Sequence, residues 1–372
     1  MAYTTTTLGS NATLVGTSAA DIVTFTTGGN ITVNGKEGDD RLTITTAAVT
    51  GGSLGFGSGT DTLSIGFATG DNGITATMGA DADTIVATAA VDTITVGGQQ
   101  GADFFNLDAA STDARYAGGG GKDEFDVDAA LTTSTLVGGS GDDEFAINTN
   151  GGAGTGFMNG QKGKDTFTIT DAYTGTVRGG SEDDTITVTD AGVTGALLAG
   201  DNGADTITDA GGANTILGGG GKDTIDGADG LDTITGGLGV DSVNYDAGDA
   251  TQVTITTADT AAQLFLEGST VTATGSFETF TDFEASDKFV VDQSTTAAVV
   301  GALTAIADDT AYIIKGDFAT ATTFITNYNG ADALLYVGDA LLTNTADISA
   351  DGTDFVLIRG GGTMTTSNLT LG

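Results

Sequence analysis

The chain contains no histidine, no cysteine, no proline and no tryptophan among its 372 residues. Without histidine, Ser-His-Asp triads, Cys-His pairs and His-based zinc proteolysis are excluded. Without cysteine there are no disulfides. Basic residues are scarce as well, because 11 Lys and Arg stand against 50 Asp and Glu, which gives a net charge of −39. So strong a negative charge argues against nucleic acid as a partner.

Long apolar runs are also missing. No run reaches 18 apolar residues, so we expect no transmembrane helix and no insertion into a membrane. The first residues, Met1 to Thr4, offer neither a basic start nor an apolar core, so no Sec-type signal peptide is predicted.

Glycine, in contrast, is abundant at 61 residues, and much of it falls into a repeat. Segments 118–126, 138–146, 218–226 and 236–244 all match G-G-x-G-x-D-x-U-x, where U is a large apolar residue. This nonapeptide is typical of a tight glycine turn followed by a short strand. The glycines allow positive φ, so that backbone carbonyls can converge beside the aspartate. Oxygen ligands without nitrogen or sulfur suit a hard cation such as Ca²⁺.

Degenerate copies of the repeat fill the intervening chain. Their aspartates are Asp40, Asp61, Asp83, Asp103, Asp165, Asp184, Asp205 and Asp232. The aspartates of the complete copies are Asp123, Asp143, Asp223 and Asp241. In every copy the residue two positions after the aspartate is apolar, which places it on the same face of a strand. Asp21 with Val23 is a thirteenth candidate that lacks the glycine two residues earlier.

The spacing of the aspartates predicts the size of each coil. From Asp40 to Asp205 they lie 19 to 22 residues apart, and from Asp223 to Asp241 they lie nine apart. We therefore expect coils of about 20 residues with an aspartate turn on one side only, and coils of 18 residues, with both turns of this kind, at the end. Asp92 and Asn214 look like remnants of the repeat on the second side. Strands of that side are expected at 135–137, 176–178, 197–199 and 215–217.

The segment from 16 to 245 resembles the RTX repeats of type I secreted bacterial proteins. The resemblance implies a Ca²⁺-binding parallel β-roll, in which the twelve aspartates and the turn carbonyls are the metal ligands. The turn glycines concerned are Gly119, Gly121, Gly139, Gly141, Gly219, Gly221, Gly237 and Gly239. Asp83 and Asp184 are the weakest candidates, because Asp81 and Glu182 replace the fourth-position glycine of their turns.

The expected fold is all-β: a right-handed parallel β-roll or β-helix solenoid over residues 16–245. Residues 1–15 would form an N-terminal cap or assembly segment, and 246–372 a β-rich cap or assembly domain with a type I secretion signal. After Asp246 glycine thins and apolar residues rise. Strands are expected there at 253–255, 264–266, 289–291, 312–314, 324–325, 334–337 and 355–358, with one short helix at 297–307.

No catalytic constellation is apparent, so we expect no enzyme. Lys122, Lys164 and Lys222 each precede a repeat aspartate and are interpreted as local charge balance at exposed turns. The family resemblance favours an extracellular, Ca²⁺-dependent structural protein of the bacterial cell surface. Such a protein would associate with itself as an S-layer or an extracellular filament. The alternatives are a Ca²⁺-dependent adhesin or matrix-binding module that contacts cell-surface polysaccharide and, less favoured, a secreted enzyme acting on polysaccharide.

Overall fold

The structure is a computed structural model that describes residues 12–25, 29–45, 49–66, 73–148, 154–228, 230 and 232–245, and the backbone of ten strands between 253 and 371. The chain divides into two units, residues 1–192 and 193–372. Each unit is built from β-strands in its described part. In these ranges no helix could cross a membrane.

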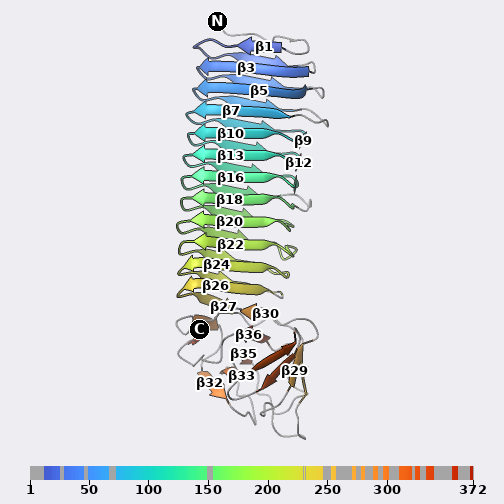
Figure 1. Cartoon of the computed structure of the whole chain (residues 1–372), viewed down its shortest axis with the longest axis vertical. Coiled ribbons are helices and arrows are strands. Elements are labelled where there is room, and N and C mark those ends of the chain that lie inside the picture. Colours follow the sequence, from blue (N-terminus) through green and yellow to red (C-terminus); the bar gives the residue numbers. More distant parts are fainter. Residues whose placement is uncertain are drawn as a thin grey trace. The chain divides into compact units, whose positions relative to one another are not determined.

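The first unit is a parallel β-solenoid in which successive coils each add one strand to sheet 1 and one strand to sheet 2 (Figure 1). The strands of sheet 1 are β1 (Ala12–Val15), β3 (Gly29–Glu37), β5 (Val49–Ser58), β7 (Ile74–Ala80), β10 (Thr95–Gln100), β13 (Arg115–Gly120), β16 (Thr135–Ser140), β18 (Phe157–Lys162) and β20 (Thr176–Ser181). All neighbouring pairs are parallel.

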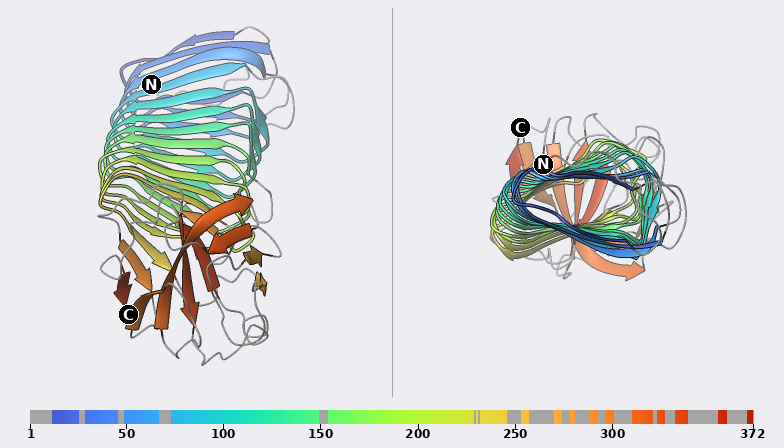
Figure 2. Two further views of the ribbon diagram at one scale, coloured as in Figure 1. Left: turned by 60° about the horizontal axis from the view of Figure 1, so that its bottom comes forward. Right: turned by 90° about the horizontal axis from the view of Figure 1, so that it is seen from above.

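Sheet 2 of the first unit faces sheet 1, and the coils superimpose when viewed along the stack (Figure 2, blue to green). Its strands are β2 (Ile22–Phe25), β4 (Arg41–Ile44), β6 (Thr62–Ile65), β8 (Thr84–Ala87), β11 (Phe104–Leu107), β14 (Glu124–Val127), β17 (Glu144–Ile147), β19 (Thr166–Ile169) and β21 (Thr185–Val188). Each of these strands begins one residue after a repeat aspartate. The pairing register aligns these aspartates from coil to coil.

The apolar residue two positions after each repeat aspartate points into the solenoid, as the sequence predicts. All twelve such residues are buried, with at most 4% of their surface exposed. In four successive coils of the first unit this residue is phenylalanine, and the rings stack with centroids 4.6, 4.7 and 4.5 Å apart from Phe105 to Phe167. This distance matches the separation of stacked strands, so one ring per coil forms a continuous apolar column.

A third, short sheet was not predicted. It consists of β9 (Val91–Asp92), β12 (Ser111–Thr112) and β15 (Leu131–Thr132), which pair in parallel at a corner of three coils. The buried Ser111 and Tyr116 hydroxyls are 3.0 Å apart next to this corner. In these three coils the corner strands use residues that an 18-residue coil does not have.

The second unit begins with coils of the shorter kind. Sheet 1 strands are β22 (Leu197–Asn202), β24 (Thr215–Gly221) and β26 (Thr233–Gly239), and sheet 2 strands are β23 (Thr206–Thr208), β25 (Thr224–Asp226) and β27 (Ser242–Tyr245). Partners in neighbouring strands are 18 residues apart, for example Thr206 with Thr224 and Thr224 with Ser242. The predicted change of coil length is therefore confirmed.

Further strands of the second unit form both antiparallel and parallel pairs. They are β28 (Val253–Thr256), β29 (Thr270–Ala273), β30 (Glu278–Phe280), β31 (Lys288–Val291), β32 (Thr296–Val300), β33 (Thr310–Thr320), β34 (Thr323–Thr326), β35 (Asp332–Gly338), β36 (Asp354–Ile358) and β37 (Leu369–Leu371). Six of the seven expected strands are present, and 264–266 lies outside the described residues. The helix expected at 297–307 is wrong over 297–300, which belong to β32 and pair with β33, while 301–307 lie outside the described residues.

Candidate cation site: a ladder of buried carboxylates

The repeat aspartates that precede the strands of sheet 2 form a ladder through the coils. We call this row the carboxylate ladder; its members are Asp21, Asp40, Asp61, Asp83, Asp103, Asp123, Asp143, Asp165 and Asp184 in the first unit and Asp205, Asp223 and Asp241 in the second. Each side chain is at most 5% exposed. Eleven of the twelve predicted aspartates are thus brought into one kind of environment, and Asp232 lies elsewhere, as described below.

One oxygen of each ladder carboxylate holds the neighbouring coil. The backbone N–H of Asp103 donates to Oδ1 of Asp123 at 2.8 Å, and the N–H of Asp123 donates to Oδ1 of Asp143 at 2.8 Å. The same bond, between 2.7 and 2.9 Å long, recurs along the described ladder of the first unit and twice in the second unit. Oδ1 therefore satisfies a backbone donor that would otherwise be buried without a partner.

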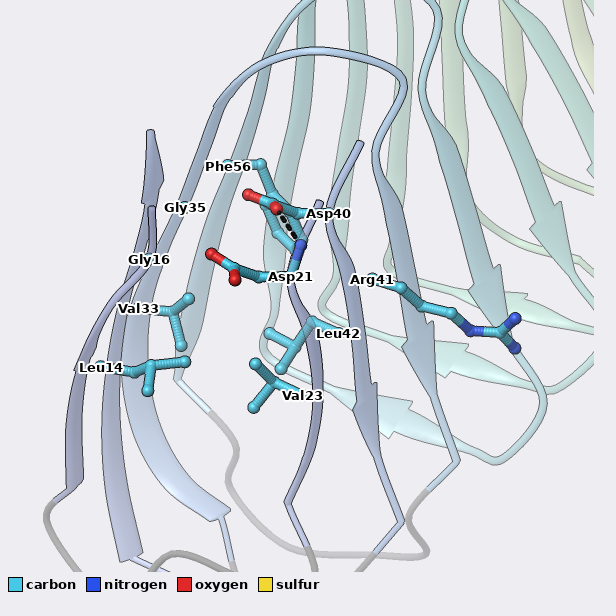
Figure 3. Close-up of a pocket in the computed structure, with 10 residues that line it drawn as sticks. All are labelled: Leu14, Gly16, Asp21, Val23, Val33, Gly35, Asp40, Arg41, Leu42 and Phe56. Atoms are coloured by element: carbon cyan, nitrogen blue, oxygen red, sulfur yellow. Dashed lines mark hydrogen bonds between the residues drawn. The ribbon is translucent and has the colours of Figure 1, made fainter. Parts of the chain in front are cut away.

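Asp21 begins the ladder, although its turn lacks the expected glycine. Figure 3 shows its N–H bonded to Oδ1 of Asp40, with Val23 and Leu42 directed toward the apolar interior below. Oδ2 of Asp21 accepts a hydrogen bond from the Thr17 N–H at 2.7 Å. The terminal rung is therefore satisfied by its own turn, in contrast to the rungs that follow.

The second oxygen of the interior rungs is buried without a hydrogen-bond partner. This holds for Oδ2 of Asp40, Asp61, Asp83, Asp103, Asp123, Asp143, Asp165 and Asp223. An unpartnered carboxylate oxygen in a protein interior is costly, because water no longer solvates it. Since the same orphan recurs in coil after coil, it is a designed feature of the repeat rather than a local defect.

Six of the eight orphan oxygens lie in a cradle that only glycine leaves open, whereas Phe56 and Met78 stand at the place of this glycine before Asp61 and Asp83. A Cβ on Gly118 would overlap Oδ2 of Asp123, and a Cβ on Gly98 would overlap Oδ2 of Asp103. The carbonyl oxygen of Gly118, one coil further on, is 2.7 Å from the position that the Gly98 Cβ would take. The cradle thus collects a carboxylate oxygen and a carbonyl oxygen, two acceptors with no donor between them.

Burial in the cradle shifts the acidity of these groups. Loss of hydration raises the pKa of Asp61, Asp83 and Asp123 to about 7 and that of Asp143 to about 8, although the backbone hydrogen bond to each opposes the shift. Neighbouring carboxylates raise the pKa of Asp143 further. At neutral pH the charge of such a ladder carboxylate can therefore be neutralised in two ways, by a proton or by a cation at Oδ2.

The second and fourth turn glycines have a role in the stacking of the coils. Gly119 and Gly121 have φ of 116° and 129°, and a Cβ on Gly121 would overlap the Gly101 carbonyl of the preceding coil. The second and fourth glycines thus allow coils to stack closely. The first glycine, which the sequence reading passed over, is the one beside Oδ2. A cation-binding role for the carbonyls of the second and fourth glycines stays a prediction.

Loss of a glycine does not disrupt the turn. Asp81 and Glu182 occupy the fourth position with φ of 80° and 84°, so the left-handed turn persists. Asp83 and Asp184 accordingly lie in the ladder, each at 2% exposure. Their lower rank as candidate cation ligands stays a prediction.

On the second side of the coil, before the strands of sheet 1, the equivalent residue varies. It is Ile94, Ala114 and Ser134 in three coils of the first unit, and Ala196, Asn214 and Asp232 in the second. Asp92 is therefore not a remnant of the repeat, because Ile94 occupies the position; Asn214 is one, as predicted.

Two neutral side chains on this side form the same inter-coil bond as the aspartates. The Ala114 N–H donates to Oγ of Ser134 at 3.2 Å, and the Ala196 N–H donates to Oδ1 of Asn214 at 2.9 Å. The Asn214 amide then donates from Nδ2 to Oδ2 of Asp209 at 2.6 Å and to the Val193 carbonyl at 3.2 Å. A positively polarised group thus occupies the place where a ladder aspartate has its orphan oxygen.

The donor set of the ladder fits a hard divalent cation. Every candidate ligand is an oxygen, from a carboxylate or a backbone carbonyl, as Ca²⁺ prefers. In the part of the chain that the structure describes, no three acidic side chains gather at one point. A cation in a cradle of the ladder would therefore be held by one or two carboxylates together with carbonyl oxygens.

The lysines that precede ladder aspartates form ion pairs between coils. Lys122 lies 3.3 Å from Glu144, and Lys164 lies 2.6 Å from Asp183, with all four side chains at least half exposed. The interpretation as charge balance at exposed turns is confirmed for these two. Exposed pairs of this kind stabilise a fold by at most about 1 kcal/mol.

Comparison with known proteins adds little. No family of proteins and no curated protein matches the chain. Among solved structures, the chain is similar to a hyperactive, Ca²⁺-dependent, β-helical antifreeze protein from an Antarctic bacterium, with 19% identity, a TM-score of 0.48 and 78% of each chain covered.

Proposed function

We propose that the chain is an extracellular, Ca²⁺-dependent structural protein with RTX-like repeats that assembles with copies of itself, as an S-layer or filament subunit of a bacterial cell surface. The observation that carries the proposal is the row of eight orphan Oδ2 atoms, six of which are buried beside a glycine at which a Cβ atom would overlap the oxygen. A repeat that needed only the inter-coil hydrogen bond could use serine or asparagine, as Ser134 and Asn214 do.

Electrostatics explains why a cation would decide folding. Carboxylates about 5 Å apart repel each other by about 3 kcal/mol per neighbouring pair at an effective dielectric constant of 20. When bound, Ca²⁺ supplies positive charge and accepts oxygen ligands. The candidate ligands are Oδ2 of the interior ladder aspartates and the carbonyl of the first glycine of the next coil, such as Gly118 beside Asp103.

Each bound ion would stabilise the fold by a modest free energy, and several ions together would stabilise it by a large one. A site with a Kd near 10⁻⁴ M that meets a tenfold excess of free Ca²⁺ stabilises the fold by about 1.4 kcal/mol. Several such sites along one ladder would separate a folded chain outside the cell from an unfolded chain inside it, where free Ca²⁺ is scarce. The chain would therefore remain threadable until export and fold afterwards.

Assembly is supported by the first coil of the first unit. Among the described residues, β1 pairs only with β3 and β2 pairs only with β4, so each has one open edge. Val15 and Ile22 on these strands are 54% and 49% exposed. Open strand edges with apolar side chains favour pairing with another chain, and bound cations would reduce the repulsion between copies that each carry a charge of −39.

The proposal is tested in two steps. Far-UV circular dichroism with Ca²⁺ and with EGTA at pH 7.5 should show β-structure only with Ca²⁺, and a spectrum that EGTA leaves unchanged would contradict the Ca²⁺ dependence. Electron microscopy of the Ca²⁺-loaded protein should then show lattices or filaments. Particles that stay monomeric at high protein concentration would contradict the structural role and leave the Ca²⁺ dependence standing.

A second candidate, an adhesin that binds cell-surface polysaccharide, is favoured by an open groove over β16, β18 and β20. Its lining includes Gly119, Gly139, Ser140, Asn159, Gln161 and Lys162. Hydroxyl and amide groups suit sugar hydroxyls, and Lys162 would suit an acidic sugar. Binding to immobilised acidic polysaccharide should weaken in the variants Gln161→Ala and Lys162→Ala, while Lys122→Ala, outside the groove, serves as the matched control.

A further inference from the structure

The two sheets of the first unit differ in the charge that they carry. The nine strands of sheet 1 contain four basic residues and one acid, whereas the nine strands of sheet 2 contain one basic residue and three acids. The single acid of sheet 1 is Glu37, the last residue of β3. In a chain with 50 acidic and 11 basic residues, a sheet almost free of acids is an exception that the overall composition does not explain.

Three basic residues of sheet 1 gather on four neighbouring strands, and we call them the basic patch. Arg115 lies in β13, Lys162 in β18 and Arg178 in β20, and β16 pairs between β13 and β18. All three side chains are exposed, and Arg115 and Arg178 alternate with buried residues, which directs them outward. Five of the eight residues that line the groove beside Lys162 are glycine or serine, so a partner surface can approach the backbone closely there.

The acids of sheet 2 also gather, and with two neighbouring acids they form what we call the acidic patch. Glu124 and Asp126 lie in β14 and Glu144 in β17, where Glu124 pairs with Glu144 in the register of the strands. Asp108 and Asp128 directly follow β11 and β14. Loss of hydration and the charges of Asp128 and Asp108 raise the pKa of Asp126. Like charges side by side destabilise a sheet, so a positively charged partner would stabilise this face.

The two patches lie on opposite outer faces of shared coils. β13 leads through one turn into β14, so Arg115 and Glu124 belong to the same coil. Figure 2 shows the two sheets on the two broad sides of the coils (blue to green). A second copy displaced perpendicular to the sheets would therefore bring its acidic patch onto the basic patch of the first. Such a contact joins two different surfaces and leaves one of each kind unused, so it can repeat without closing.

The spacing of the charges favours a second copy over a polysaccharide as the partner of the basic patch. Both patches are built on the same stack of strands, which repeats at about 4.8 Å. The charges of two copies can therefore match in register over several coils, and a polysaccharide need not share this repeat.

We propose that copies of the chain associate side by side, with the basic patch on sheet 1 of one copy against the acidic patch on sheet 2 of the next. This inference rests on the proposed self-assembly and specifies a second contact for it. The open edges of β1 and β2 lie at an end of the stack, whereas the patches lie on its sides. Together the two contacts run in two directions, as a layer requires.

The test uses two charge-reversed full-length chains with Ca²⁺, with their fold checked by circular dichroism and their association measured by sedimentation velocity. Variant A carries Arg115→Glu, Lys162→Glu and Arg178→Glu, which makes both faces acidic. Variant B carries Glu124→Lys, Asp126→Lys and Glu144→Lys, which makes both faces largely basic. Each alone should associate at least roughly 10-fold more weakly than the wild type, because like charges meet at the contact. An equimolar mixture should associate again, because A then meets B.

The matched control for variant A combines Lys122→Glu, Lys164→Glu and Lys222→Glu. It changes the net charge by the same amount, but at exposed turns rather than on the face of sheet 1. This control should associate as the wild type does. If it weakens association as much as variant A does, or if the mixture of A and B stays monomeric, the lateral contact is overturned.

The remaining outcomes separate this contact from self-assembly itself. If variants A and B both assemble as the wild type does, the lateral contact is overturned and self-assembly stands. Weaker binding of variant A to an acidic polysaccharide would in that case assign the basic patch to that ligand. A wild type that stays monomeric with Ca²⁺ overturns both proposals. Should variant B fail to fold, variant A still decides the matter, because association equal to that of its control overturns the contact.

Discussion

The two sides of the coil use different side chains to provide an acceptor for a backbone N–H of the neighbouring coil. On both sides a side-chain oxygen accepts a hydrogen bond from the backbone N–H of the equivalent residue in the preceding coil. The acceptor is Asp123 on one side and Ser134 or Asn214 on the other. The bond itself therefore needs no charge. What aspartate adds is Oδ2, buried and without a donor, at a cost that the neutral side chains avoid. The difference supports the proposal that the ladder binds a cation, while the second side serves largely for packing.

Removal of Ca²⁺ should give the largest effect, because it acts on every rung at once. At pH 7.5 the chain with EGTA should lose its cooperative thermal transition, since unneutralised carboxylates repel along the whole ladder. Differential scanning calorimetry checks this. Addition of Mg²⁺ in place of Ca²⁺ is the control and should restore the transition poorly, because Mg²⁺ demands a more rigid geometry. If the thermal transition without metal equals the transition with Ca²⁺, the ladder needs a cation no more than the second side of the coil does.

Mild acid should partly replace the cation. In the metal-free fold, burial raises the pKa of Asp61 and Asp123 to about 7 from an ordinary value of 3.8. Folding then takes up protons, so the free energy of unfolding falls as the pH rises from about 4 to about 7. The slope is about 1.4 kcal/mol per pH unit for each such carboxyl. Urea unfolding with EGTA at several pH values between about 4.5 and 6, where protonation keeps the metal-free chain folded, measures it.

The same experiment with Ca²⁺ sharpens the comparison. A bound cation keeps the carboxylates ionised, so the dependence of unfolding on pH should be much weaker between pH 6 and 8 than in EGTA. Equal slopes with and without Ca²⁺ would mean that no cation competes with the proton at Oδ2.

Conversion of ladder rungs to the chemistry of the second side should have a smaller effect with a distinctive sign. Asp123→Asn with Asp143→Asn retains the inter-coil bond and replaces each orphan oxygen with an amide donor. In EGTA at about pH 6, where protonation keeps the metal-free wild type folded, the variant should be more stable than the wild type by about 1–3 kcal/mol per site, because a buried unpaired carboxylate is removed. With saturating Ca²⁺ it should be less stable, because two rungs no longer bind the cation. Urea unfolding measures both differences, and a variant that responds to Ca²⁺ as the wild type does would be contrary to this account.

The smallest effect is expected on the second side itself. Ser134→Ala removes the acceptor of the Ala114 N–H and should reduce the free energy of unfolding by about 1 kcal/mol. Because no charge is involved, the loss should be the same in Ca²⁺ and in EGTA. A loss that appears in only one of the two solutions would show that this side also takes part in cation binding.

The coupling of aspartate with an apolar residue two positions later was enough to predict the coils, the strands of both sides and the change to 18-residue coils. It could not reveal that Oδ1 accepts a backbone N–H of the neighbouring coil while Oδ2 has no hydrogen-bond partner, because both facts depend on how neighbouring coils stack. Asp209, the buried acid that accepts a hydrogen bond from the Asn214 amide, was not predicted because it lies outside the repeat. The five-residue spacing to Asn214, equal to that between Gly118 and Asp123, is the signal that could have found it.

In two places neighbouring strands or coils decide the local backbone conformation. The run from Ala297 has the composition of a helix, yet pairing with β33 makes 297–300 a strand, so tertiary contacts outweigh local propensity. In the turns, Asp81 and Glu182 stand where the complete repeats have their fourth-position glycine. The stacked coils on either side impose the left-handed conformation, and these residues adopt it.

Equilibrium dialysis against Ca²⁺ at pH 7.5 tests the central claim most directly. We expect several ions per chain at millimolar free Ca²⁺, a lower number when Asp123 and Asp143 are replaced by asparagine, and an unchanged number in Ser134→Ala. A wild-type chain that stays folded in this experiment and binds no Ca²⁺ would contradict the account.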